Sequence, residues 1–514
     1  MQTTAFCLGV ARGCSLSCLP AARPAGGPSW RWQMRRTLRC RQQQAPAPEA
    51  QHEVDDRSSK NPCGFYASVW GDFFLHHPDP AASSQQQTWM VERVEELKKD
   101  VAKLISSSNT YLERMKLIIA LERLCLDYLF EKDINAALKE IYGANVSDFD
   151  LHTIAIWFYL LRKHGYKVSS EVFVKFLDED GSFMATTPRE LLSLYNAAHF
   201  RTHGEIILDK VISFTKVSLE TKLPYLEGSL AHEIQCALEI PLPRKVAIYD
   251  AKIYISTYEK EPTMNKLVLE LAKVNFNLMQ RQYQQELKTT TRWWNNLQVH
   301  SRLPFARDRL VECYLWMLGV YYQPSCSRGR IILTIVIYTT TIFDDIYDSF
   351  GTPEECELFT QWVERSFMSG WDTNVARVLP ECMQYAFGKI MESYEIIENE
   401  LAPEEKYRMT YLKNFREQMI PHVASTMDSY MKQHNVSIKI ARQKIQELKE
   451  ESWKDFNGQW LEPDDDQPRK LIEVIFNLTR TMEFMYNKDD NFTNCRNLED
   501  TIQSLFVEPF EIVL

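Results

Sequence analysis

The chain has 514 residues, of which 45% are hydrophobic and 25% charged, a composition typical of a folded globular protein and not of a disordered one. Its 17 glycines are too few for the dense turns of a β-sandwich or a propeller, which argues against an all-β fold. Residues 1–50 carry a net charge of +6 and the rest of the chain −16, so the acidic body argues against a nucleic-acid binder, which needs a basic surface.

The first 50 residues are rich in Arg, Ala, Ser and Pro and hold one acidic residue, Glu49. This composition is typical of a transit peptide and predicts a chloroplast location. The alternative is a disordered basic tail on a cytoplasmic protein. Twelve scattered cysteines form no Cys-x-x-Cys pair, which is typical of unpaired thiols in a reducing compartment. No apolar run reaches the roughly 18–20 residues that span a bilayer, so we expect no membrane contact.

Beyond residue 60 the apolar residues recur at helical spacing, as in Val94, Leu97 and Val101 and in the segments 115–128 and 173–177. Breakers such as 178–181, 203–204 and 241–243 separate the helical segments. We therefore predict an all-α fold with two helical domains, the first over residues 62–262 and the second over residues 263–514.

Three carboxylates, Asp344, Asp345 and Asp348, end an apolar helical run over residues 331–343. On a helix, Asp344 and Asp348 stand one turn apart on the same face. Like charges at a buried helix end need a neutralising cation, and Mg²⁺ shares its oxygen ligands between carboxylates, water and substrate phosphates. We predict a Mg²⁺ site here, with Mn²⁺ as a substitute. A solvated acidic helix end is the alternative.

Two further elements precede this motif. Arg307 and Arg309 carry guanidiniums that can clamp phosphate oxygens, although taken alone the string favours a surface ion pair with Asp308. Trp316 offers a ring face that attracts cations, although core packing is its commoner role. Taken together, metal, clamp and aromatic wall suit the ionisation of an allylic diphosphate, whose carbocation needs a dry pocket.

From residue 64 onward the chain resembles the plant terpene synthases, most closely the sesquiterpene-type synthases of angiosperms. The matching blocks lie in the same order along the chain, at residues 68–72, 124–128, 164–166, 176–181, 194–198, 237–243, 292–294, 303–316 and 344–348. The resemblance implies an N-terminal α-barrel domain of mostly structural role and a C-terminal class I α-domain that binds Mg²⁺. It also implies a monomeric carbon–oxygen lyase acting on a small prenyl diphosphate.

The resemblance assigns roles to individual residues. Asp344, Asp345 and Asp348 bind metal, Arg307 and Arg309 hold diphosphate, and Trp316 faces the carbocation. A late loop at 489–493 closes over the pocket, and Phe492 stands where the family usually has Tyr. A paired Arg typical of monoterpene synthases is absent, which favours farnesyl diphosphate. The transit peptide points to plastids and leaves geranyl diphosphate open.

The resemblance is interrupted at the second metal motif. Glu417 matches its final Glu, but the positions eight and four residues earlier hold Met409 and Lys413, which cannot replace its Mg²⁺-binding oxygens. We expect an internal deletion at 415/416, on the order of eighty residues, or several helices at about 1.5 Å per residue. The alternative function is therefore a catalytically impaired splice or gene-model variant, a non-enzymatic helical protein. A chain-elongating prenyltransferase normally has two Asp-rich motifs, and this sequence has one.

Overall fold

The computed structural model describes residues 64–77, 84–179, 183–185, 187–369, 379–406, 426–463 and 469–512. These residues form helices and loops, with β-structure limited to isolated bridges such as that between Leu177 and Phe183, so the all-α prediction is confirmed. No helix in the described ranges is long and apolar enough to cross a membrane. The predicted transit peptide, Glu417 and the 415/416 junction lie outside the described residues.

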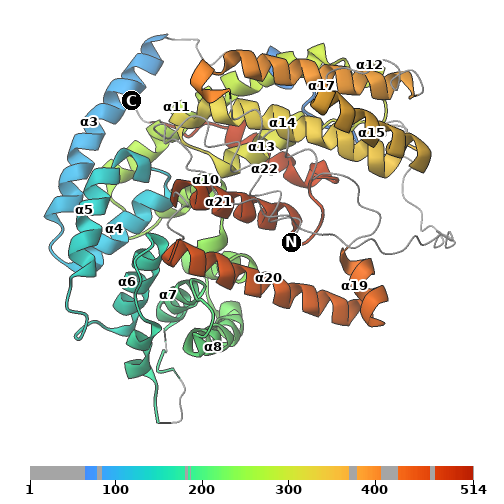
Figure 1. Cartoon of the computed structure of the whole chain (residues 1–514). Coiled ribbons are helices and arrows are strands. Elements are labelled where there is room, and N and C mark those ends of the chain that lie inside the picture. Colours follow the sequence, from blue (N-terminus) through green and yellow to red (C-terminus); the bar gives the residue numbers. More distant parts are fainter. Residues whose placement is uncertain are drawn as a thin grey trace.

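Helices α3 to α8 of the first group occupy the left-hand side and the lower part of Figure 1, and α10 lies near its centre. The central helix of this group, α6, is buried along almost its whole length, and α7 and α8 pack beside it in turn. Side-chain caps define several of the helix starts, including a capping box between Thr187 and Glu190 at α7. The group comprises α2 (Phe73–His76), α3 (Ser84–Ser107), α4 (Tyr111–Arg123), α5 (Glu131–Tyr142), α6 (Leu151–Lys163), α7 (Pro188–Ala198), α8 (Ile206–Lys222), α9 (Gly228–Glu239) and α10 (Ala247–Tyr258).

The helical segment expected over residues 115–128 is divided. Helix α4 ends at Arg123, and a 3-10 turn follows at Asp127–Leu129. Between them Cys125 has a φ of 54°, a left-handed conformation that ends an α-helix. The apolar spacing continues through this turn because both pieces face the same core, so periodicity alone did not reveal the break.

The second group is centred on α13, whose eleven residues are all buried between α11, α14 and α21. A helix that is apolar on every side has to be buried in this way. The group comprises α11 (Lys266–Asn296), α12 (Val299–Arg302), α13 (Leu310–Val320), α14 (Ser327–Asp345), α15 (Pro353–Ser369), α17 (Glu381–Glu400), α19 (Thr426–His434), α20 (Ile438–Leu461), α21 (Arg469–Tyr486) and α22 (Glu499–Phe506).

The two groups share a core. The largest hydrophobic cluster extends from Trp70 to Phe506, and α3 lies along α11, where Arg93 forms an ion pair with Glu270. The expected domain boundary at 262/263 falls in the turn between α10 and α11. The first helices of the chain therefore pack directly against the second group.

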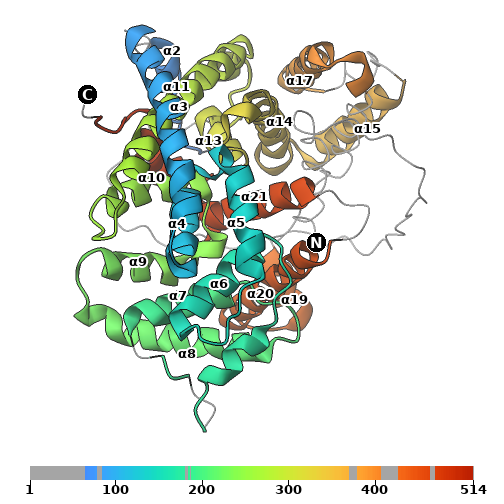
Figure 2. The same ribbon diagram turned by 90° about the vertical axis from the view of Figure 1, so that its left-hand side faces the viewer.

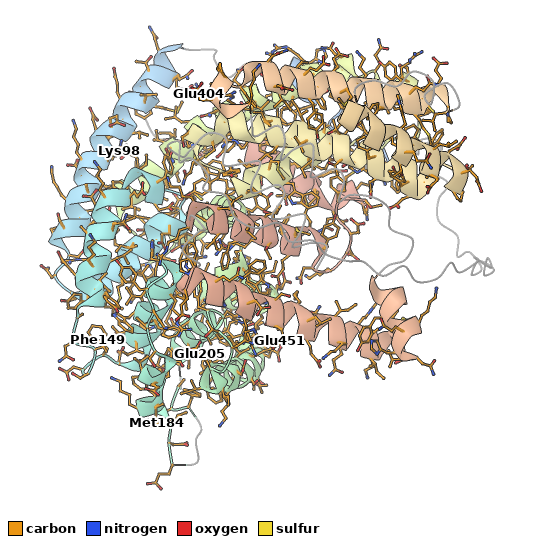
Figure 3. The ribbon with its side chains drawn as sticks, viewed as in Figure 1. Lys98, Phe149, Met184, Glu205, Glu404 and Glu451 are labelled. Carbon is orange, nitrogen blue, oxygen red and sulfur yellow. The ribbon has the colours of Figure 1, made fainter. Side chains whose placement is uncertain are left out.

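The described helices from α15 to α20 are spread over two places. In both views α15 and α17 lie together in the upper right, whereas α19 and α20 lie below, beside the first group (Figures 1 and 2). Figure 3 labels Glu451 on α20 and Glu205 just before α8, where the side chains of the two groups meet. At this contact the His203 Nδ1 atom lies 3.4 Å from a carboxylate oxygen of Glu451. Residues 407–425, which include 415/416, connect these two places in sequence.

Candidate active site

The Asp-rich motif lies where α14 changes its helical geometry. Helix α14 ends at Asp345 and continues as a π-helical turn over Ile346–Phe350, closed by a bond of 2.7 Å from the Gly351 amide to the Ile346 carbonyl. A Cβ at Gly351 would lie 2.7 Å from Cys356 Sγ, so a larger residue would force the neighbouring side chains to shift. Single π-turns inside helices often mark functional sites, because the wider turn redirects side chains.

The three aspartates have different surroundings. Asp344 and Asp348 are exposed, whereas Asp345 is 1% exposed and turned into the protein. Within the described ranges no three acidic, His or Cys side chains converge into a complete metal cage. Two exposed carboxylates at this helix end nevertheless fit a Mg²⁺ ion that takes its remaining ligands from water and a diphosphate.

Arg307 is held against the motif by backbone and side chain. Its amide donates to Asp345 Oδ2 at 2.7 Å, and its carbonyl accepts from the Tyr338 hydroxyl at 3.2 Å. Its guanidinium donates to Asp344 Oδ2 at 2.5 Å and forms an ion pair with Asp345 across 2.6 Å. Burial raises the pKa of Asp345 to about 6, against the opposing charge of Arg307.

The inner and outer parts of the arginine–aspartate cluster differ. Arg307 Nε and Asp345 Oδ1 are both buried and face each other as an ion pair across 2.6 Å. Asp344, by contrast, is about half exposed, so its carboxylate and the guanidinium end bound to it can be reached from outside. A cation on the outer carboxylates and an anion on Arg307 would complete this donor set, so the residues present fit a metal-bound diphosphate.

Arg309 has different partners from Arg307. It is fully buried, and its guanidinium donates to four backbone carbonyls at 2.6–2.9 Å. These carbonyls belong to Tyr66, Asp308, Phe492 and Thr493. The sequence predicts a clamp of two arginines on one anion, but the structure brings only Arg307 to the aspartates.

An aromatic wall stands beside Arg307. Trp316, on α13, meets Phe492 edge-on at a ring-centroid distance of 5.4 Å and Tyr486 at 6.0 Å. The Arg307 guanidinium lies 5.5 Å from the centre of the Phe492 ring. The indole N–H of Trp316 is buried without a hydrogen-bond partner. Phe492 therefore packs between the tryptophan and the arginine.

Sequence reasoning assigned no individual role to three residues of this site. Tyr486 ends α21, the Thr493 hydroxyl accepts from Arg307 at 3.4 Å, and Ser68 donates to the buried Glu312 at 2.9 Å. None belongs to a pattern that states its role. Their only signal is position, since Thr493 adjoins Phe492 and Ser68 lies in a matching block.

Two domain models match the chain. The N-terminal domain of terpene synthases matches residues 69–238, and the metal-binding domain of the terpene synthase family matches residues 295–420. The chain is also 46% identical, over 550 aligned positions, to the chloroplastic alpha-terpineol synthase of Zea mays, with 89% of this chain and 87% of that protein covered. The chain belongs to the terpene synthase family.

Other terpene synthases are similar to this chain along most of its length. The beta-sesquiphellandrene synthase of Sorghum bicolor is 36% identical, covering 87% of this chain and 96% of that protein. A solved limonene synthase with 2-fluorolinalyl diphosphate superposes with a TM-score of 0.80 at 26% identity, over 88% of this chain and all of that one. The family resemblance stated from the motifs is thus confirmed.

A metal-containing neighbour bears on the cofactor of this terpene synthase. Isoprene synthase from grey poplar, solved with three Mg²⁺ ions and dimethylallyl-S-thiolodiphosphate, superposes with a TM-score of 0.70 at 25% identity, over 84% of this chain and 99% of that one. Together with the matched metal-binding domain, it supports a divalent metal as the cofactor of this family member.

The maize enzyme also has more residues in the aligned region than this chain. The alignment extends over 550 positions but uses 89% of the 514 residues here, about 457, so roughly 90 positions of the relative face no residue of this chain. If helical, that many residues would form several helices, since an α-helix rises about 1.5 Å per residue.

Proposed function

We propose that this terpene synthase ionises an allylic prenyl diphosphate, releases diphosphate and forms a terpene. The observation that carries the proposal is the cluster of Arg307, Asp344 and Asp345 beside the ring of Phe492. A cationic side chain, outward carboxylates and an aromatic wall lie together at the end of one buried helix. This arrangement separates an anionic leaving group from a carbocation.

Asp344 and Asp348 are the residues that would hold the metal, with Asp345 behind them. When bound, Mg²⁺ supplies Lewis-acid neutralisation of the leaving diphosphate. Arg307 donates hydrogen bonds to the diphosphate oxygens, which requires its guanidinium to release part of its contact with Asp344. In the free protein this contact neutralises the aspartates and holds the arginine in place.

Trp316 and Phe492 act on the hydrocarbon part of the substrate. Their ring faces stabilise positive charge, by about 2 kcal/mol or more where water is excluded. Phe492 is almost fully buried and covers the tryptophan, which limits the access of water to the cation.

The substrate is geranyl or farnesyl diphosphate. The 46% identity to an enzyme named for alpha-terpineol, a ten-carbon alcohol, favours geranyl diphosphate. The missing paired arginine and the relatives named for sesquiterpenes favour farnesyl diphosphate. The chloroplastic maize relative supports a plastid location and residues 1–50 as a transit peptide.

A second candidate is a terpene synthase that has lost its activity. The roughly 90 unmatched positions support an internal deletion, which we place at 415/416, where Met409 and Lys413 stand in place of two metal ligands. Glu417 would then be what remains of the second metal motif. Such a chain binds its ligands weakly, if at all, and persists as a non-enzymatic helical protein.

Purified protein incubated with geranyl or farnesyl diphosphate, with Mg²⁺ or EDTA, distinguishes the two candidates. The leading proposal expects volatile products by gas chromatography–mass spectrometry that disappear with EDTA and in Asp344→Asn. Absence of product from both substrates, in folded protein, would overturn it. Mg²⁺-dependent binding of inorganic diphosphate without turnover would identify the inactive family member.

A further inference from the structure

Arg309 joins three parts of the chain that are far apart in sequence. It is the residue before the first turn of α13, and four of its five N–H groups donate to carbonyl oxygens. One carbonyl belongs to Tyr66 near the start of the described chain, and two belong to Phe492 and Thr493 after α21. A planar guanidinium can make several such bonds at once, which an ammonium group cannot.

Hydrogen bonds within the loop after α21 also hold its backbone in place. Asp490 Oδ1 accepts the amides of Phe492 and Thr493 at 3.1 and 2.9 Å. The carbonyls of the same two residues face Arg309. The loop is therefore held between an exposed carboxylate and a buried guanidinium, and both contacts act on the backbone that carries the Phe492 ring.

The N-terminal segment makes a second hydrogen bond to helix α13. Ser68 donates to Glu312, one turn along α13 from Arg309, and Phe65 lies 5.1 Å from the Arg307 guanidinium. Residues 65–68 therefore lie against both Arg309 and Arg307. The N-terminal segment and the late loop both accept hydrogen bonds from Arg309. Their rings, Phe65 and Phe492, both lie over the guanidinium of Arg307.

Direct contact between Arg309 and a phosphate is difficult in this arrangement. The residue has no exposed surface, and the carbonyls of Phe492 and Thr493 stand around its guanidinium. To reach an anion, the side chain would have to leave four hydrogen bonds, whereas Arg307 has only to shift away from Asp344.

We propose that Arg309 is a positioning residue, which ties the N-terminal segment 65–68 to the loop 490–494 and so holds Phe492 against Trp316 and Thr493 against Arg307. The link to turnover rests on the proposed function, whereas the structural tie does not. Loss of the tie leaves the charge on Arg307 intact but opens the aromatic wall to water.

Arg309→Lys tests this positioning role, because lysine keeps the positive charge but cannot form the four hydrogen bonds of the planar guanidinium. In the free protein we expect at least about tenfold faster amide exchange at residues 490–494 and faster chymotrypsin cleavage at Phe65 and Tyr66. Affinity for inorganic diphosphate with Mg²⁺ should change less than about threefold. Arg307→Lys is the matched control, with unchanged exchange and at least about tenfold weaker diphosphate binding.

If the chain is active, Arg309→Lys should also raise the ratio of alcohol to hydrocarbon products, because water reaches the cation, with KM changed less than kcat. The free-protein measurements still decide the proposal if no terpene forms, so failure of the proposed function is a separate result. Equal loss of diphosphate affinity in both lysine variants, with unchanged exchange in Arg309→Lys, would overturn the proposal.

Two measurements apply if Arg309→Lys does not fold. Asp490→Ala, at an exposed position, should speed exchange at residues 491–494 and leave chymotrypsin cleavage at Tyr66 unchanged, because Arg309 still holds that carbonyl. A crystal structure of the unmutated protein with Mg²⁺ and inorganic diphosphate should show the anion on Arg307 and the four carbonyls on Arg309. An Arg309 side chain turned onto the anion would contradict the proposal.

Discussion

Arg307 and Arg309 are two residues apart, yet one meets carboxylates and the other carbonyls. The backbone of Arg307 is held to α14 through Asp345 and Tyr338, which directs its side chain to the motif. Arg309 begins α13, and its side chain extends to the loop after α21. At the residue scale, therefore, the anchoring of the backbone decides the partner of each guanidinium.

Asp344→Asn should weaken the binding of metal and diphosphate without unfolding the protein. Its carboxylate is half-exposed, so its loss costs little stability, while the outer metal face loses one of two charged ligands. Mg²⁺ with inorganic diphosphate should raise the Tm of the native chain, and the variant should lose at least half of that increase. Glu354→Gln, an exposed acid at the start of α15, is the control and should keep the full increase.

Glu312 predicts a pH-dependent stability. Burial raises its pKa to about 7, against the opposing charge of Arg309. Protonation is therefore favoured by folding: this contribution is complete below the unfolded value of 4.5 and is lost as the pH rises through 7. Glu312→Gln keeps an acceptor for Ser68 and removes the charge. Its stability relative to the native chain should rise between pH 5 and pH 8 by up to about 3 kcal/mol.

Urea unfolding at pH 5 and pH 8 measures this change. If the stability difference between Glu312→Gln and the native chain is the same at both pH values, folding does not raise the pKa of Glu312.

At the scale of helices, α20 is attached to the first group by hydrogen-bonded ion pairs between arginine and glutamate. Arg244, almost fully buried, donates two hydrogen bonds to Glu450, and Arg201 donates a third at 2.8 Å. Burial alone would raise the pKa of Glu450, but the two guanidiniums outweigh it and hold that pKa well below its usual range. The carboxylate therefore stabilises the fold above pH 4.5, and this contribution is lost as the pH falls.

Glu450→Gln should lower the free energy of unfolding by about 2 kcal/mol at pH 7, because two buried guanidiniums each lose one counter-charge and keep only Asp209 or Glu483. The partial exposure of Glu450 keeps this loss below the range for fully buried pairs. The difference should shrink as the pH falls below 4.5. Glu447→Gln, on the same helix and paired only at the exposed surface, should change stability by less than about 0.5 kcal/mol. Equal losses in both variants would contradict this account of the attachment of α20.

At the scale of the whole molecule, the chain lacks material that its relatives have. The helices α15 and α17 stand apart from α19 and α20 in both views, and the proposed junction lies between them in sequence (Figures 1 and 2). Ile438, Ile440 and Leu448 on α20 are about half exposed. The proposed deletion predicts such exposure, because the segment that would cover these side chains is absent.

Insertion of the unmatched segment of the maize relative between Phe415 and Arg416 should restore this packing. We expect higher Tm, weaker binding of the dye ANS, and Mg²⁺-dependent turnover at least about tenfold above the native chain, because the second metal motif is then complete. A scrambled segment of equal length is the control. A native chain as active as the insertion variant would show that the deletion does not affect catalysis.

The sequence by itself determined the helical class, the Asp-rich motif and the family. Each depends on short-range regularity: apolar residues at a period of 3.6 have to face a core, and the Asp-rich motif is confined to the five adjacent residues 344–348. Trp316 and the 489–493 loop were also found in sequence, through the resemblance. The break at Cys125 was missed because the apolar spacing continues across it.

Only the tertiary structure decided the partners of Arg309, the burial of Asp345 and the contact of Phe492 with Trp316. These contacts join residues far apart in sequence, brought together by the packing of α13 against α14 and α21. No local pattern encodes the direction of a side chain across such an interface, because it depends on which helices lie beside it. For that reason two arginines of one motif, alike in sequence, have different surroundings in the fold.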